Sequence, residues 1–293
     1  MTLHAVVGQV DVGWDIARNQ ARVVSFLQAE AGPGMFVVLP EAALTGYDDG
    51  LSGLADIDQG ALADGINAVA QTARQLSAHV MCGALLREQG SWSNAALYFG
   101  PNGERWTYRK VNLATHERGR LAAGASLSPL KLPGGRTSAL VGVQLCRELK
   151  FPEQWHVLAR RGAQLFAYLT YAANPAIPKA VWRSHLISRA AETQRFVLAA
   201  NVAHPAQHCP SMVISPDGRV LAESTSTTMQ ALHADLDLTA ASDWVVSQQR
   251  ADVVGISYTG TDAGLEPSQA GLGYGDPRYP SSAQMEPRWP LSG

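Results

Sequence analysis

Short apolar segments alternate with amphipathic segments along most of this chain, and this alternation constrains the fold more than any other feature. Apolar runs such as residues 35–40 and 196–203 are typical of buried strands. Between residues 61 and 77 the apolar side chains recur every three or four positions, which predicts an amphipathic helix. No Pro-, Gly- or Ser-rich linker separates these units before residue 259, so we expect one α/β domain.

The same pattern predicts the individual elements. The expected strands cover residues 4–10, 35–40, 79–87, 94–99, 105–109, 138–146, 164–171, 196–203, 211–214, 219–222 and 229–236. The expected helices cover residues 14–30, 61–77, 152–161 and 178–193. Tight-turn sequences at residues 100–103 and 215–218 predict two hairpins, and residues 229–236 are expected to form an edge strand.

The C-terminal residues 259–293 differ from the rest of the chain, because they are dense in Gly, Pro and Ser and show no apolar periodicity. Free disorder is one interpretation of such a composition. Four large apolar or aromatic side chains nevertheless give this tail something to dock with: Tyr274, Tyr279, Trp289 and Leu291. We therefore assign residues 1–258 to one domain and expect the tail to pack along that domain or across a subunit interface.

The composition excludes several classes of function. Lys and Arg number 23 against 25 Asp and Glu, without a basic cluster, so nucleic acid is not an expected partner. No apolar run approaches the roughly 20 residues of a membrane span, and the N-terminus does not resemble a signal peptide. Three cysteines, Cys82, Cys146 and Cys209, lack metal-ligand spacing and predict neither disulfides nor a metal site. We expect a cytoplasmic protein that needs no cofactor and no metal.

Cys146 ends an expected strand, and a helix-initiating Pro152-Glu153 pair follows it shortly afterwards. A thiol at such a corner lies at the carboxyl edge of a sheet, where α/β proteins build their sites. A free cysteine there can equally be a small core residue. As a nucleophile it would need a base or a cation nearby.

Two other expected strands also end in ionisable residues, Glu41 and Lys110. Taken singly, Glu41 is interpretable as a helix cap and Lys110 as a solvated loop residue. No local signature joins Cys146 to a histidine, although five histidines are candidates for such a partner: His116, His156, His185, His204 and His208. A Cys/His hydrolase is therefore the weaker hypothesis.

Three segments, LPEAALTGY from Leu39, YRKVNL from Tyr108 and VQLCRELKFPE from Val143, occur in this order. Together they resemble the signature blocks of the nitrilase superfamily of carbon–nitrogen hydrolases, in its amidase- or carbamoylase-like branch. The resemblance extends from about residue 4 to residue 250 and includes the segments 188–201 and 211–218. It implies a four-layer α-β-β-α sandwich that assembles as a homodimer or larger homo-oligomer.

The resemblance also implies roles for individual residues. Glu41 is expected to be the general base, Cys146 the nucleophile, and Lys110 the cation that favours the thiolate and the oxyanion. The backbone N–H of Arg147 would complete the oxyanion hole, and Glu117 resembles the second glutamate that orients Lys110 or the substrate nitrogen.

Residues after the next strand are expected to line the pocket, with Tyr171 and Asn174 as candidate substrate contacts. The loop that carries His204, His208 and Cys209 departs from the family pattern, and its role stays open. For Lys150 we favour a structural ion pair over a substrate contact, and Arg189 and Glu192 are expected to pair on one helix face.

The expected reaction is hydrolysis of the carbon–nitrogen bond of a small-molecule amide through a Cys146 thioester, with release of ammonia and a carboxylic acid. An N-carbamoyl amine or amino-acid amidohydrolase is the alternative. Nitriles are less favoured, because Arg147 stands where true nitrilases usually carry Trp. A catalytically silent binding protein on the same fold is a rival from another class.

Overall fold

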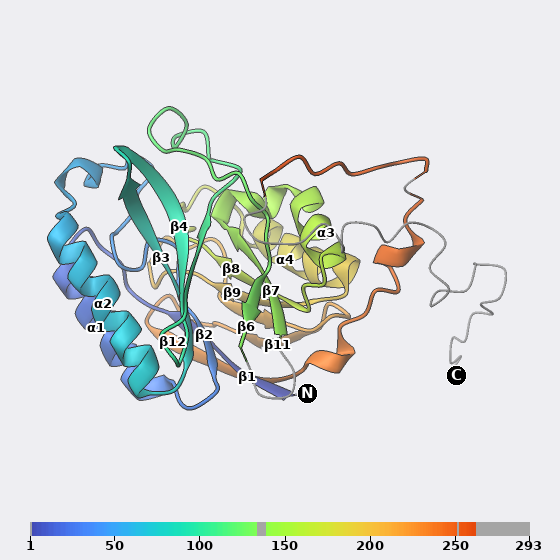
Figure 1. Ribbon diagram of the computed structural model, residues 1–293, viewed down its shortest axis with the longest axis horizontal. Coiled ribbons are helices and arrows are strands. Elements are labelled where there is room, and N and C mark those ends of the chain that lie inside the picture. The colour runs from blue at the N-terminus through green and yellow to red at the C-terminus, as the bar shows by residue number, and fades with distance from the viewer. Residues whose placement is uncertain (1, 134–138, 251, 262–293) are drawn as a thin grey trace. The chain divides into compact units, whose positions relative to one another are not determined.

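The computed structural model describes residues 2–133, 139–250 and 252–261, which belong to one compact unit. Within this unit two six-stranded sheets lie face to face, and helices cover their outer faces (Figure 1). The layers therefore run helix, sheet, sheet, helix, as the family resemblance implies. No helix among the described residues is both long and apolar enough to cross a membrane.

The first sheet contains the N-terminal strands and closes with a strand from the far end of the unit. Its order is β12 (Gln230–Asp237), β1 (Thr2–Gln9), β2 (Phe36–Val38), β3 (His79–Glu88), β4 (Ser91–Phe99) and β5 (Arg105–Arg109). The three strands β1, β2 and β3 are parallel, and β12 pairs antiparallel to β1 at the edge. Helices α1 (Ile16–Glu30) and α2 (Gln59–Gln75) make the crossovers and cover the outer face (Figure 1).

The second sheet repeats this plan with the later strands. Its order is β11 (Val220–Glu223), β10 (Met212–Ile214), β9 (Phe196–Ala200), β8 (Leu165–Leu169), β7 (Ala139–Leu145) and β6 (Leu130–Leu132). Strands β7, β8 and β9 are parallel and alternate with helices α3 (Pro152–Arg160) and α4 (Lys179–Thr193). The parallel strands place the ends of β7 and β8 at one edge of this sheet.

The core is divided by the alternation of side chains along each strand. In β1, Val7 packs into the cluster between the two sheets, whereas Val6 packs with residues of α1 and α2. The strand β3 does the same with Met81 toward the other sheet and Val80 toward the helices. Because both faces of the parallel strands are buried over most of their length, these strands are largely apolar, which explains the apolar runs in the sequence.

Every expected helix and strand is present, with ends that differ by a few residues. The strand expected over residues 138–146 stops at Leu145, so Cys146 belongs to a short 3-10 helix, Cys146–Lys150, that the sequence pattern did not predict. Strand β6 was also missed, because three residues are too few to show a period. The predicted tail lies outside the described residues from residue 262 onward.

Gly83 provides a test of how the first sheet positions Glu41. A methyl group at Gly83 would clash with the backbone of Glu41 and Ala42. Gly83→Ala should therefore lower the free energy of unfolding by about 1–3 kcal/mol and lower activity through displacement of Glu41. Thermal unfolding and ammonia release measure the two effects.

Gly13→Ala is the matched control, because a methyl group there meets nothing within 4 Å. If both variants had the same unfolding temperature and the same rate of ammonia release, Gly83 would not pack closely against the backbone of Glu41.

Candidate active site

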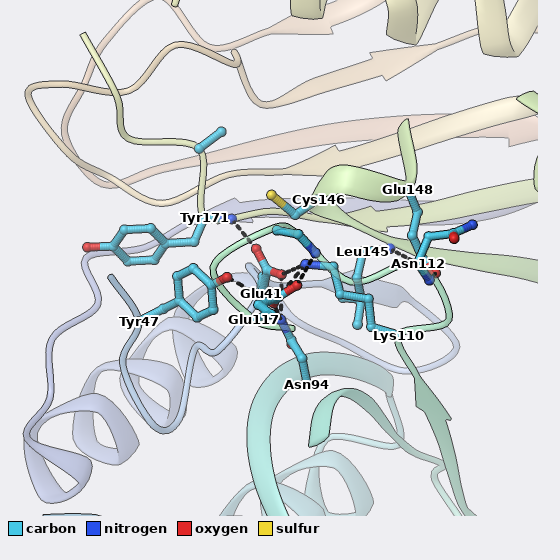
Figure 2. Close-up of polar contacts among 12 residues, drawn as sticks. Glu41, Tyr47, Asn94, Lys110, Asn112, Glu117, Leu145, Cys146, Glu148 and Tyr171 are labelled. Carbon is cyan, nitrogen blue, oxygen red and sulfur yellow. Dashed lines mark hydrogen bonds and ion pairs between the residues drawn. The ribbon is translucent and has the colours of Figure 1, made fainter. Parts of the chain in front are cut away.

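Three strand ends supply the ionisable groups of the site. Glu41 follows β2 after a two-residue extension, Lys110 follows β5 directly, and Cys146 follows β7 directly. Figure 2 shows the three side chains gathered at one place between the sheets. The charges of Glu41 and Lys110 both act on the Cys146 thiol, which agrees with their proximity. The structure thus brings together the three residues that the sequence singled out.

Lys110 lies at the centre of this group. Its Nζ donates to Oε1 of Glu41 at 3.0 Å and to Oε1 of Glu117 at 2.9 Å, and all three side chains are fully buried. Burial alone would lower the pKa of Lys110, but the negative charges of Glu41 and Glu117 outweigh it and raise the pKa. Lys110 also opposes the effect of burial on Glu117, so that the pKa of this carboxyl is lowered. Lys110 is therefore a permanent cation.

Asn94 and Tyr47 also donate hydrogen bonds to the carboxylates of Glu41 and Glu117. Nδ2 of Asn94 donates to Oε1 of Glu41 at 2.8 Å and to Oε1 of Glu117 at 2.7 Å. The Tyr47 hydroxyl donates to Oε1 of Glu117 at 2.8 Å and lies 2.7 Å from Nε2 of His116. The sequence analysis did not identify Asn94 or Tyr47 as site residues. An amide inside the apolar strand β4 was the available signal for Asn94.

The second oxygen of Glu41 is held by the segment that follows β8. Oε2 accepts a hydrogen bond from the backbone N–H of Tyr171 at 2.8 Å. The Tyr171 ring lies against the Tyr47 ring, with centroids 5.6 Å apart, and its centroid is 6.4 Å from that of His204. Tyr171 thus reaches the site through its backbone as well as bordering it with its ring (Figure 2).

Asn174 lies on the same segment, and its polar groups have local partners. Its N–H donates to Nδ1 of His208 at 2.8 Å, and its side-chain oxygen accepts from the N–H of Ala176 at 3.0 Å. His208 packs edge-on against Trp182, and burial lowers the pKa of its imidazole to about 4. His208 is therefore neutral near pH 7. It connects the Asn174 segment to the loop of His204, His208 and Cys209, to which the sequence analysis assigned no role.

Cys146 itself has an unusual backbone conformation. It is the first residue of the 3-10 helix and has φ of 41°, in the left-handed region that non-glycine residues rarely adopt. Burial raises the pKa of its thiol to about 12, Glu41 acts in the same direction, and Lys110 and the Thr170 hydroxyl oppose the rise. The resting thiol is consequently protonated, and it would need a base to act as a nucleophile.

Glu148 joins the cysteine segment to the lysine segment. One of its oxygens accepts from the N–H of Leu145 at 2.8 Å, and the other accepts from the N–H of Val111 at 2.8 Å and from the Tyr108 hydroxyl at 2.7 Å. Burial raises the pKa of this carboxyl, and the hydrogen bonds that it accepts from Leu145 and Tyr108 act against the rise. This positioning residue was missed because sequence spacing does not show which backbone groups a carboxylate will reach.

The sequence analysis gave structural roles to Arg189 and Lys150. Arg189 contacts the end of the 3-10 helix that begins at Cys146, and Lys150 is the last residue of that helix. Arg189 pairs with Glu192 at 2.6 Å, as predicted, and it also donates to the carbonyl oxygen of Leu149 at 2.9 and 3.1 Å. Lys150 has no ion-pair partner in the part of the chain that the structure describes; its Nζ lies 5.4 Å from the centroid of the Trp182 ring. The expected ion pair of Lys150 is therefore replaced by a cation–π contact.

The two remaining cysteines are buried, and burial raises the pKa of each thiol: to about 12 for Cys82, and further for Cys209. The ionisable groups that most affect the Cys146 thiol are carboxylates and a lysine, which weakens the Cys/His hypothesis further. Among the described residues, no group of three or more His, Cys, Asp or Glu could hold a metal ion.

Comparison with known proteins identifies the class to which this fold and site belong. The family model named carbon-nitrogen hydrolase matches residues 4–245, which is more than half of the 293 residues. The chain belongs to the carbon–nitrogen hydrolase family, and the expected resemblance to the nitrilase superfamily is confirmed.

The chain is similar in sequence to several curated amidases of that family. A 2-oxoglutaramate amidase from Bacillus subtilis is 31% identical over 221 residues, covering 71% of this chain and 80% of the relative. An (R)-stereoselective amidase from a Pseudomonas species is 28% identical, covering 76% and 81%. An omega-amidase from Homo sapiens is 28% identical, covering 75% and 83%.

Solved structures confirm the fold. An amidase of the nitrilase superfamily from Nesterenkonia AN1 superposes with a TM-score of 0.71 at 20% identity, covering 86% of this chain and 95% of that chain. The Nit3 protein of Saccharomyces cerevisiae superposes with a TM-score of 0.68 at 20% identity, covering 87% and 95%. The predicted sandwich of two sheets between helices is therefore the fold of this superfamily.

Glu148→Gln tests the link between the cysteine and lysine segments. The variant replaces one carboxylate oxygen with an NH2 group, which cannot accept the backbone hydrogen bond that the oxygen accepted. Two donors would then face each other, which should lower the free energy of unfolding by about 1–3 kcal/mol. Activity should fall by at least about tenfold, because Cys146 and Lys110 lose their common support. Thermal unfolding and steady-state kinetics measure both quantities.

Glu153→Gln is the control, because Glu153 is an exposed carboxyl on the adjoining helix α3. If Glu148→Gln matched this control in both measurements, the linking role of Glu148 would be wrong.

Proposed function

We propose that this protein is an amidase that hydrolyses the carbon–nitrogen bond of a small-molecule amide through a thioester on Cys146. One observation carries the proposal: the buried Lys110 ammonium is held between the carboxylates of Glu41 and Glu117 and interacts with the Cys146 thiol. A fixed cation beside a thiol and a buried carboxylate provides the base, the nucleophile and the oxyanion stabiliser that acyl transfer needs.

The reaction would begin with proton transfer from the thiol to Glu41. The protonated thiol is a poor nucleophile, and the raised pKa means that few thiolates exist at rest. Glu41 is held by Asn94, Lys110 and the Tyr171 N–H, so its position is fixed before substrate arrives. As the proton leaves, Lys110 stabilises the thiolate that attacks the amide carbon.

The tetrahedral intermediate would carry its negative charge on the former carbonyl oxygen. Lys110 and the backbone N–H of Arg147 would stabilise this oxyanion, and one such donor contributes about 3–4 kcal/mol in comparable enzymes. Glu41 then gives its proton to the departing nitrogen, the carbon–nitrogen bond breaks, and ammonia leaves. The acyl group remains on sulfur as a thioester.

Hydrolysis of the thioester would use the same groups. Glu41 accepts a proton from water, the resulting hydroxide attacks the thioester carbon, and the carbon–sulfur bond breaks to release a carboxylic acid. The proton returns from Glu41 to sulfur, so the cycle needs no cofactor. Glu117 would act on Lys110, because the second carboxylate holds the ammonium in place throughout.

The substrate class rests on the relatives, which include amidases and omega-amidases. A linear amide is the substrate that we favour, with the Tyr171 and Asn174 segment lining its pocket. An N-carbamoyl amine or amino acid is the alternative and would release carbon dioxide together with ammonia. We further propose a cytoplasmic location and a homodimer or larger homo-oligomer.

Intact-mass measurement on a panel of amides and N-carbamoyl compounds tests the proposed intermediate. Wild-type protein quenched during turnover should carry the mass of one acyl group, and the amide series should give the larger adduct signal. Cys146→Ala should form no adduct and release no ammonia, because the nucleophilic sulfur is missing. Undiminished ammonia release from Cys146→Ala would sink the proposal.

Iodoacetamide distinguishes an enzyme from a silent binding protein. Cys146 is partly exposed, whereas Cys82 and Cys209 are completely buried. Cys146 should be alkylated at least about tenfold faster than either, because the others react only when the fold opens locally. Peptide mapping after short exposure gives the three rates, and equal rates would favour a protein without a reactive site.

A further inference from the structure

The hydroxyl of Tyr168 makes a contact with the nucleophile segment that the proposed reaction does not yet use. Tyr168 lies in β8 and is completely buried. Its hydroxyl donates a hydrogen bond to the backbone carbonyl oxygen of Cys146, with 2.8 Å between the oxygens. Burial, reinforced by the nearby Cys146, raises the pKa of Tyr168 well above its usual value, so the hydroxyl keeps its proton and remains a donor.

The carbonyl of Cys146 and the N–H of Arg147 belong to the same peptide unit. This unit is planar and trans, so its C=O and its N–H point in opposite directions. A hydrogen bond that fixes the direction of the carbonyl therefore fixes the direction of the N–H as well. That N–H is the backbone donor of the proposed oxyanion hole.

This peptide unit needs outside support. Cys146 has φ of 41°, a conformation that persists only where the surroundings hold it. Glu148 fixes the N–H of Leu145 before the cysteine, and Arg189 fixes the carbonyl of Leu149 after it. Tyr168 holds the carbonyl between them, and it does so from the neighbouring strand of the same sheet.

The position of Tyr168 is itself fixed. Parallel pairing of β7 and β8 places Tyr168 beside Gln144, two residues before the nucleophile, and its length carries the hydroxyl past the end of β7. Its ring packs against Trp155, whose centroid lies 6.0 Å away, and the indole N–H of Trp155 donates to the carbonyl of Glu148. The hydroxyl therefore cannot move without disturbing the packed core.

We propose that Tyr168 is a positioning residue that orients the Arg147 N–H for the oxyanion by holding the Cys146 carbonyl. The proposal rests on the proposed amidase function, because it assigns Tyr168 to the oxyanion hole of that reaction. It gives the tyrosine hydroxyl an effect on the tetrahedral intermediate and no direct contact with substrate.

Tyr168→Phe removes the hydroxyl and keeps the ring. With the best amide, kcat should fall by about 10- to 100-fold with a change in KM of less than about twofold, because the lost alignment matters only as the oxyanion forms. The aldehyde that corresponds to this amide adds to Cys146 as a tetrahedral adduct, and its inhibition constant should rise by a similar factor. The rate of Cys146 alkylation by iodoacetamide should stay unchanged, because alkylation forms no oxyanion.

Tyr98→Phe is the matched control. Tyr98 is also buried, and its hydroxyl lies 2.8 Å from Nδ1 of His79, its one hydrogen-bond partner among the residues that the structure describes. This part of the first sheet holds none of the residues assigned to the reaction. This variant should lose a similar amount of stability and keep the wild-type kcat and inhibition constant.

Three results would overturn the proposal. An inhibition constant for Tyr168→Phe equal to that of the control excludes a role in the oxyanion hole. A parallel fall of kcat and alkylation rate would show that Tyr168 acts on the thiol or on the folded fraction. A rise in KM alone would assign it to substrate binding. Wild-type and Cys146→Ala ammonia release are measured alongside, so a failure of the amidase function is recognised separately from a failure of the Tyr168 proposal.

Discussion

The ammonium group of Lys110 is fully buried, and the arrangement of the site follows from the need to compensate its charge. An isolated charge in the core would cost far more free energy than the fold can supply, so Lys110 requires buried anions. Glu41 and Glu117 provide them. Asn94 and Tyr47 donate further hydrogen bonds to the carboxylate oxygens that Lys110 contacts, and the backbone N–H groups of Tyr171 and Ala114 donate to the other two oxygens. With both carboxylates ionised, the group of three carries one excess negative charge. Removal of the Lys110 charge would leave two buried carboxylates without a cation, whereas removal of either carboxylate would leave one ion pair.

The proposed nucleophile, Cys146, depends on a second set of buried interactions. Cys146 occupies a left-handed backbone conformation, and side chains from separate elements hold the peptide groups around it. Glu148 contacts the start of the turn, Tyr168 its first carbonyl, and Arg189 its end. Glu148 also reaches the segment after Lys110, so the position of the thiol and that of the ammonium are set by one carboxylate. The charge cluster and the strained turn thus form a single structure between the two sheets.

Much of the fold was predictable, because strands buried on both faces and helices with one apolar face leave strong patterns. The elements that escaped prediction among the described residues are short: β6 and the 3-10 helices, including the one that begins at Cys146. Glu41, Lys110, Glu117 and Cys146 were found because they lie in motifs that resemble a known family. Four other residues of the site were not found: Asn94, Tyr47, Glu148 and Tyr168. Their roles depend on hydrogen bonds to residues that are distant in the sequence, and no local motif shows such bonds.

The sequence by itself determined the α/β class, most of the helices and strands, and the identities of the ionisable groups that follow three of the strands. Hydrophobic periodicity and local motifs are properties of neighbouring residues, so they can be recognised along the chain. Only the tertiary structure decided that Lys110 lies between two carboxylates, that the backbone of Tyr171 holds Glu41, and that Tyr168 holds the carbonyl of Cys146. These contacts join residues far apart in the sequence, and the direction of each hydrogen bond is fixed by how the two sheets pack and by the register of their strands.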